Sequence, residues 1–210
     1  TSCLPLRGGK GRQWEGGIKQ PYYIKVPGLT QAKSTSAIPV TGTDFFPTML
    51  ELAGLPAMPK QHIDGLSLVP LLNGNKIADR SLFWHYPHYG NQGGEPSAII
   101  RKGDWKLIYY YEDGRNELYQ LSADTGEQND LSANKPELTQ SLRKELDTWL
   151  KDTGALIPLK DKRFNPVAKK KHQQTFTKKH KAQLEKIHAR YLIPNYVPNK
   201  NWWGSKLTED

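Results

Sequence analysis

The chain has 210 residues, 36% of them hydrophobic, and a formal net charge of +9, so it has room for one sizeable core or for a modest domain with a tail. Ten Tyr and six Trp argue against a wholly disordered chain, the single cysteine excludes an internal disulfide, and no apolar run is long enough to span a bilayer. The charge is uneven, because eleven Lys and Arg against two acidic residues between Lys160 and Arg190 account for the whole excess.

A glycine-rich stretch, PLRGGKGRQWEGG, begins at Pro5 and holds one lysine, Lys10, between glycines. A phosphate-binding P-loop needs Ser or Thr after its Gly-Lys pair and another glycine five residues before that pair. Here those positions hold Gly11 and Leu4, and Trp14 stands where the dinucleotide fingerprint requires its last glycine. The stretch therefore does not fit a nucleotide site, and a solvated surface loop is the plain alternative to a functional one.

A short strand and a helix are predicted before residue 60. PYYIKVPG, from Pro21 to Gly28, is typical of a strand that ends at a Pro-Gly turn. Residues 43–54 predict a helix with Thr43 as N-cap, Asp44 in its first turn and Gly54 as its stop. Its apolar face consists of Phe45, Phe46, Met49, Leu50 and Ala53.

β-Rich runs dominate the middle of the chain. Ser81–Tyr86 predicts a buried strand, which leads into HYPHYGNQGGEPS, a loop rich in His, Tyr and Gly. Residues 97–121 predict an antiparallel meander, with turns marked by Lys102-Gly103 and Asp113-Gly114. Arg101 and Lys106 alternate with apolar residues, so we expect them on a solvated face.

A helix is predicted from Asn134 to Leu150. Asn134 and Glu137 have the spacing of a capping box, and Gly154 fits the helix stop. One apolar stripe runs along it, made of Leu138, Leu142, Leu146, Trp149 and Leu150.

The basic segment after residue 160 predicts a helix near residues 177–192. It has three interpretations: a solvated tail, a patch that attracts an anionic polysaccharide, and a nucleic-acid-binding surface. The last is the least favoured, because Phe176 and Tyr191 are few aromatics for base stacking.

The order of the motifs resembles that of type I sulfatases, the arylsulfatase-like branch of the alkaline phosphatase superfamily, and is closest to bacterial sulfatases of polysaccharides. PLRGGKGRQWEGGIKQPYYIKVPG resembles the segment that brings an active-site lysine to the substrate sulfate. It is followed in family order by TDFFPTMLELAGL, DGLSLVPLLNG, RSLFWHYPHYG and IRKGDWKLIYYYEDGRNELYQLSADTGEQNDL. The resemblance covers about residues 1–157.

The resemblance implies an α/β fold with an α+β C-terminal part. Residues 1–80 would be the end of the mixed-sheet catalytic domain, 81–157 a small subdomain with an antiparallel sheet packed on a C-terminal helix, and 158–210 a basic extension. It implies hydrolysis of sulfate esters of a sulfated carbohydrate or an aryl sulfate. An exported location, periplasmic or secreted, is expected as well.

The resemblance also implies site residues. Lys10 is expected to be catalytic, stabilising charge on the sulfate oxygens, and the loop residues His85, His88 and Tyr89 are expected to bind substrate. Arg7 is interpreted as a structural residue, paired with Glu15.

Two parts of the family's active site are expected to lie in an N-terminal part that this chain does not contain. One is the formylglycine nucleophile, made from Cys or Ser within C/S-x-P-x-R, and the other is the set of calcium ligands. Cys3 is interpreted as lying outside such a motif, and no metal ligand is assigned to the chain. We therefore expect the isolated chain to be inactive and its partner to be the missing N-terminal part. The alternative is a non-catalytic module that binds sulfated glycans or other polyanions through the basic tail.

Overall fold

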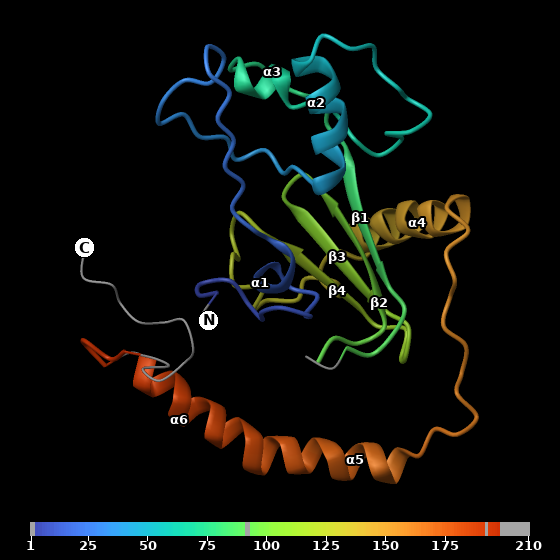
Figure 1. Cartoon of the computed structure of the whole chain (residues 1–210). Coiled ribbons are helices and arrows are strands. Elements are labelled where there is room, and N and C mark those ends of the chain that lie inside the picture. The colour runs from blue at the N-terminus through green and yellow to red at the C-terminus, as the bar shows by residue number, and fades with distance from the viewer. Residues whose placement is uncertain (1–2, 91–92, 192, 198–210) are drawn as a thin grey trace. The chain divides into compact units, whose positions relative to one another are not determined.

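The computed structural model describes residues 3–90, 93–191 and 193–197. The chain separates into two compact units, Thr1–Pro158 and Leu159–Asp210 (Figure 1). The predicted division of the first unit near residue 80 stays a prediction. Within the described residues, no helix combines the length and the apolar character that crossing a membrane requires.

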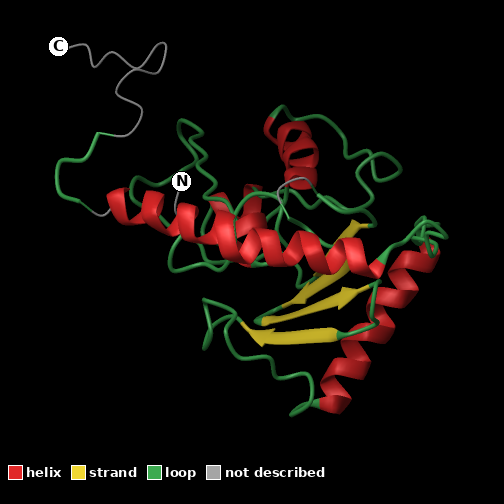
Figure 2. Ribbon diagram, turned by 90° about the horizontal axis from the view of Figure 1, so that it is seen from below, coloured by secondary structure: helices red, strands yellow, loops and turns green. Residues whose placement is uncertain are grey.

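A four-stranded antiparallel sheet lies at the centre of the first unit (Figure 2). Its strands, in spatial order, are β1 (Ser81–Tyr86), β2 (Ser97–Lys102), β3 (Trp105–Tyr110) and β4 (Asn116–Gln120). The predicted meander is confirmed, with both turns on glycines at positive φ, Gly103 at 56° and Gly114 at 73°. β1 is half-buried rather than buried, because it is the edge strand and pairs only with β2.

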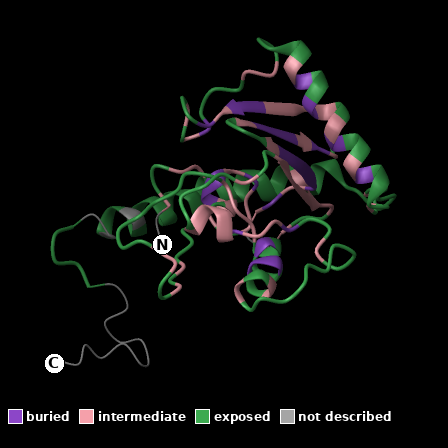
Figure 3. Ribbon diagram, turned by 90° about the horizontal axis from the view of Figure 1, so that it is seen from above, coloured by how far each residue is buried: buried purple, intermediate pink, exposed green. Residues whose placement is uncertain are grey.

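Helix α4 (Pro136–Asp152) covers one face of this sheet. Leu142, Leu146 and Leu150 are buried against strand residues, so the predicted apolar stripe is confirmed; buried and exposed positions alternate along the helix in Figure 3. The predicted capping box is wrong, because Pro136 occupies the first helical position and Lys135 becomes the N-cap.

The opposite face of the sheet is covered by the N-terminal segment, which includes the short helix α1 (Glu15–Ile18). Trp14 and Ile18 pack with Trp84 against a second cluster of buried strand residues, Ile99, Ile108, Tyr110, Tyr119 and Leu121. The sheet is therefore the middle layer between α4 and a loop-rich layer that carries Lys10.

Residues 19–80 differ most from the expectation. No strand occurs among residues 3–80, so the predicted strand Pro21–Gly28 is wrong: no described strand pairs with this segment, and Tyr23 is 89% exposed. The predicted helix begins with a 3-10 turn, η1 (Gly42–Asp44), which leads into α2 (Phe45–Leu52).

The start of α2 is fixed by Asp44, whose side chain accepts a hydrogen bond from the Thr41 N–H at 2.8 Å. Thr43 is therefore not the N-cap, while Gly54, at φ 66°, is the predicted stop. The predicted apolar face is largely exposed, with Phe45, Phe46 and Met49 between 41% and 55% accessible. A second short helix, α3 (Val69–Leu72), follows.

The second unit is helical over most of its described part. It comprises α5 (Pro166–Thr175), the π-helical turn η2 (Phe176–Lys181) and α6 (Ala182–Tyr191). The predicted helix is present but begins eleven residues earlier than expected, because the Asn165 side chain accepts hydrogen bonds from the Val167 and Ala168 N–H groups. Residues 198–210 lie outside the described residues.

Candidate active site

Lys10 lies at the tip of a glycine-rich loop and is exposed. Within the described parts of the chain its amine makes no hydrogen bond or ion pair. The Arg12 N–H donates to the Gly9 carbonyl at 3.0 Å, which closes the turn around Lys10. At the base of the loop, a Cβ on Gly17 would lie 2.1 Å from the Arg12 carbonyl oxygen, so only glycine permits this close approach.

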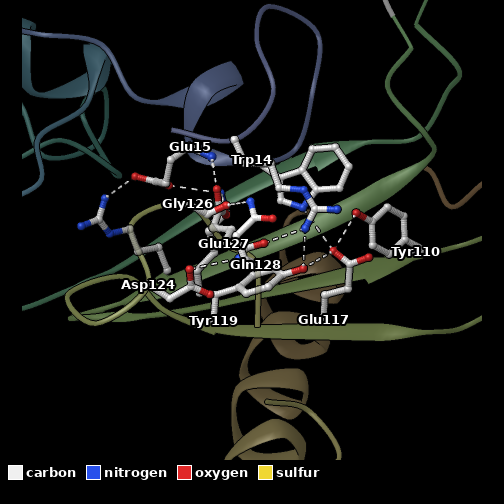
Figure 4. A network of polar contacts seen from close by, with 12 residues as sticks. Trp14, Glu15, Tyr110, Glu117, Tyr119, Asp124, Gly126, Glu127 and Gln128 are labelled. Carbon is white, nitrogen blue, oxygen red and sulfur yellow. Dashed lines mark hydrogen bonds and ion pairs between the residues drawn. The ribbon is translucent and has the colours of Figure 1, made fainter. Parts of the chain in front are cut away.

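A buried ionic network anchors this loop to the sheet (Figure 4). The Lys106 ammonium, fully buried, lies 3.1 Å from Glu15 Oε1 and 2.9 Å from Glu127 Oε1. The second contact is an ion pair rather than a directed hydrogen bond, because Glu127 Oε1 has no partner with hydrogen-bond geometry. The Glu15 backbone N–H donates to Glu127 Oε2 at 2.6 Å, which ties α1 to the turn after β4.

Arg101 also belongs to this network, with its Nη1 3.1 Å from Glu15 Oε2. The expectation that Arg101 and Lys106 line a solvated face is therefore wrong. Both point to the sheet face that the N-terminal segment covers, so water is replaced there by two carboxylates. Strand alternation itself, which puts Lys106 on the side of Ile108, was a signal that could have shown this.

Burial raises the pKa of Glu127, and the neighbouring carboxylate of Glu15 adds to this effect. The ammonium of Lys106 acts in the opposite direction without cancelling it. One buried cation is therefore shared between two carboxylates, and the network holds the loop through charge as well as through packing.

Arg7 has the structural role expected, but its partners differ. Its Nη1 donates to the Glu127 carbonyl oxygen at 2.6 Å and to the Tyr119 hydroxyl at 3.2 Å, and its guanidinium lies 3.9 Å from the centre of the Trp14 ring. Trp14 in turn donates to Glu117 Oε2 at 3.2 Å. Arg7 therefore fixes the start of the loop on β4 and does not reach Glu15.

The His/Tyr/Gly loop between β1 and β2 is held directly against the Lys10 loop. Arg12 donates to the Gly93 carbonyl oxygen, and Gln13 Nε2 donates to the Glu95 carbonyl oxygen at 2.6 Å. A Cβ on Gly94 would lie 2.3 Å from the Gly11 carbonyl oxygen, so the two backbones touch. Sequence reasoning missed Arg12 and Gln13, since no local pattern marks a contact between residues more than 80 positions apart.

This contact brings the loop of His88 and Tyr89 beside the Lys10 loop. Both side chains are exposed; the His88 ring contacts Tyr86 in a tilted arrangement, with centroids 4.0 Å apart and an interplanar angle of 46°. The Tyr89 hydroxyl donates to Glu112 Oε2 at 2.6 Å. Partial burial and this carboxylate raise the pKa of Tyr89 to about 12, so its hydroxyl remains protonated and able to donate at neutral pH.

His85 is placed elsewhere. It projects from β1 to the sheet face that α4 covers. Phe83, two residues earlier in the same strand, lies on this face and stacks on Trp149 of α4. Its Nε2 is 3.0 Å from the Leu156 carbonyl oxygen and its Nδ1 is 2.9 Å from the Tyr111 hydroxyl. The structure therefore does not bring His85 to Lys10, and both ring nitrogens serve structural contacts.

Cys3 requires a correction. Cys3, Pro5 and Arg7 do have the C-x-P-x-R spacing, so the interpretation that Cys3 stands outside such a pattern is wrong at the level of the sequence. In the fold this Arg7 is committed to Trp14, Tyr119 and Glu127, and Cys3 is half-buried in the turn that precedes the Lys10 loop. The spacing alone does not make Cys3 a nucleophile.

A calcium site is not formed by the residues that the structure describes. Among residues 3–90, 93–191 and 193–197, no group of three or more His, Cys, Asp or Glu side chains is arranged to hold a metal ion. The donor set that calcium prefers, several carboxylate and carbonyl oxygens around one point, has no counterpart near Lys10.

Comparisons with known proteins point to one family. The family described as N-sulphoglucosamine sulphohydrolase, C-terminal, matches residues 10–155. A sulfatase of Formosa agariphila is 37% identical over 166 residues, and this match covers 71% of this chain and 30% of that protein. Arylsulfatase K of Rattus norvegicus is 30% identical over 148 residues, and this match covers 65% of this chain and 25% of that protein. The crystal structure of Ps i-CgsB in complex with k-i-k-neocarrahexaose is 28% identical with a TM-score of 0.58, covering 70% of this chain and 32% of that one. This chain thus spans between a quarter and a third of the length of these relatives, and it belongs to the sulfatase family, matching its C-terminal region.

Proposed function

We propose that this chain is the C-terminal part of a sulfatase that hydrolyses sulfate esters of a sulfated carbohydrate, and that Lys10 contacts the sulfate. The observation that carries the proposal is the exposed amine of Lys10, which pairs with no residue in the described part of the chain and lies on a loop anchored by the Lys106–Glu15–Glu127 network. The carbohydrate substrate class is supported by the oligosaccharide bound to the related Ps i-CgsB.

The chemistry of sulfate ester hydrolysis gives such an amine a task. Negative charge builds up on the sulfate oxygens in the transition state, and a positioned cation stabilises it. A charge-assisted hydrogen bond contributes about 1.5–3 kcal/mol, and lysine supplies a compact point charge. In the whole enzyme a formylglycine would supply the nucleophile and calcium would hold the sulfate, both from the preceding part of the protein. His88 and Tyr89, on the adjoining loop, would bind the sugar.

Replacing Lys10 in the full-length protein tests the proposal. Lys10→Met should lower kcat/KM on a sulfated oligosaccharide by about 10- to 100-fold, as expected for one lost charge-assisted bond. Lys19→Met, an equal change at an exposed lysine beyond α1, is the matched control and should leave kcat/KM unchanged. Equal activity of the Lys10→Met and wild-type enzymes would contradict the proposal.

The export of the whole enzyme belongs to the same proposal, because an intact polysaccharide is too large to enter the cytoplasm unaided. Fractionation of the native host should find the protein in the periplasm or the medium. Recovery from the cytoplasm alone would contradict this.

A second candidate function is polyanion binding by the helical tail. It is favoured by the exposure of most described side chains over α5, η2 and α6, which carry eight of the chain's Lys and Arg residues, from Lys169 to Arg190. If the tail binds sulfated glycans, replacing Lys178, Lys179 and Lys181 with Gln in the full chain should lower the salt concentration that elutes it from heparin. Unchanged elution would exclude this function, and equally strong binding to duplex DNA would assign the tail to polyanions in general.

A further inference from the structure

A hollow of about 450 Å³ lies between β3 and α4, on the sheet face turned away from the Lys10 loop. Tyr109 and Tyr111 form its wall on the strand side, while Arg143, Asp147 and Lys151 of α4 form the opposite wall. The chain that follows α4 closes one end. Its volume lies in the range of small-molecule sites.

The charged groups of this hollow are oriented but incompletely paired. The Arg143 guanidinium carbon lies over the Tyr109 ring, 3.2 Å from its centre, and Arg143 Nε donates to Asp147 Oδ1 at 2.8 Å. Its two Nη groups make no hydrogen bond to any residue that the structure describes, and neither does the exposed Lys151 ammonium. Two cationic donors therefore border the same hollow with capacity left for a ligand.

The aromatic wall is braced from β1 by His85. The Tyr111 hydroxyl lies 2.9 Å from His85 Nδ1, and His85 Nε2 lies 3.0 Å from the Leu156 carbonyl oxygen, so one imidazole fixes both the wall and the closing segment. The rings of Tyr109 and Tyr111 meet edge to face with centroids 5.2 Å apart. Burial raises the pKa of Tyr111 to about 12, which keeps its hydroxyl neutral.

This combination matches the chemistry of an anionic sugar. Tyrosine rings offer an apolar surface to the C–H face of a pyranose and hydroxyls to its polar edge. Arginine and lysine donors match sulfate or carboxylate oxygens. Asp147 and the C-terminal end of α4 oppose an anion, so binding should be modest and should weaken with salt.

We propose that this hollow binds one anionic saccharide unit, on the opposite face of the sheet from Lys10. The choice of sulfate over carboxylate as the anionic group rests on the proposed function. The position of the binding site does not depend on that function, because it follows from the residues that line the hollow.

Titration of the full 210-residue chain with a sulfated disaccharide tests the proposal, with binding followed by the amide NMR signals of residues 109–111 and 143–157. Lys151→Met and Arg143→Met should each raise Kd by about tenfold, as expected for one lost charge-assisted bond. Lys144→Met removes the same charge from an exposed position of the same helix outside the hollow and should leave Kd unchanged. Because Lys151 is exposed, its replacement should not disturb folding.

The outcomes separate the parts of the proposal. A Kd that rises equally in Lys144→Met and Lys151→Met, or perturbed signals elsewhere only, would overturn the site. If the desulfated disaccharide binds equally well, the claim that the ligand must carry an anionic group is wrong. If a uronic acid disaccharide binds equally well, the claim that the hollow prefers sulfate to carboxylate is wrong. Full activity of Lys10→Met would sink the proposed function and leave a measured Kd at this hollow intact.

Discussion

The two faces of the four-stranded sheet are built from different interactions. On the α4 face, Leu142, Leu146 and Leu150 pack on apolar strand residues, and the contacts depend on shape and burial. On the other face, the Lys10 loop is held through a buried ammonium and two carboxylates. Both faces therefore contribute to stability, but the α4 face does so by apolar packing, whereas the other face combines an apolar cluster with a buried ion network that also positions the functional loop.

The largest effect should come from removing the buried cation. Lys106→Met removes the cation that pairs with the buried Glu127 and leaves Glu15 with Arg101, so we expect a loss of about 3–5 kcal/mol of unfolding free energy. Denaturant unfolding of the full-length protein measures it. The double variant that adds Glu127→Gln should recover most of this loss, because it removes the stranded charge while Glu15 stays paired with Arg101.

Leu146→Ala on the other face provides the matched comparison, with a loss of about 2–5 kcal/mol from its cavity. Well below its melting temperature this variant should keep the kcat of the full-length enzyme, whereas Lys106→Met should lower it. An equal loss of kcat in both variants would contradict the claim that the Lys106 network positions the Lys10 loop and that the α4 face does not.

A smaller effect should come from the contact between the two loops. Gly94→Ala places a Cβ 2.3 Å from the Gly11 carbonyl oxygen and should push the His88 and Tyr89 loop away from Lys10. We expect KM for a sulfated oligosaccharide to rise by about tenfold, with little change for a small aryl sulfate that needs only the sulfate contact. Gly42→Ala, at a glycine with open space around it and, like Gly94, without a positive φ, controls for the replacement of a glycine by alanine. A parallel loss on both substrates would show that the loop contact serves stability alone.

The smallest effect concerns pH. Because burial raises the pKa of Glu127, the folded state binds more protons than the unfolded state between the ordinary Glu value of 4.5 and the higher folded value. The contribution of Glu127 to the unfolding free energy should therefore fall as the pH rises through that window. Glu127→Gln should flatten this part of the stability curve measured by urea titration, while a curve identical to wild type would exclude Glu127 as its source.

Local sequence patterns predicted the α4 face and the meander well. The leucine stripe of α4 and the glycines at 103 and 114 act within a few residues, so the sequence displays them directly. Lys10 as an exposed loop residue followed from its glycines and from the family resemblance. Lys106 was misassigned because its partner Glu15 lies 91 residues away, and no periodicity encodes that distance. The strand at Pro21–Gly28 failed for a related reason, since a strand requires a pairing partner outside its own segment.

The buried network also constrains the order of folding during synthesis. Arg7, Arg12 and Glu15 leave the ribosome before their partners Gly93, Arg101, Lys106 and Glu127, which lie 81 to 120 residues later in the chain. The loop cannot acquire its ion pairs until β2, β3 and the turn after β4 have been translated and paired, since long-range contacts form only after the chain between them is available. A nascent chain that stops before Glu127 would therefore carry Lys10 without the support that orients it.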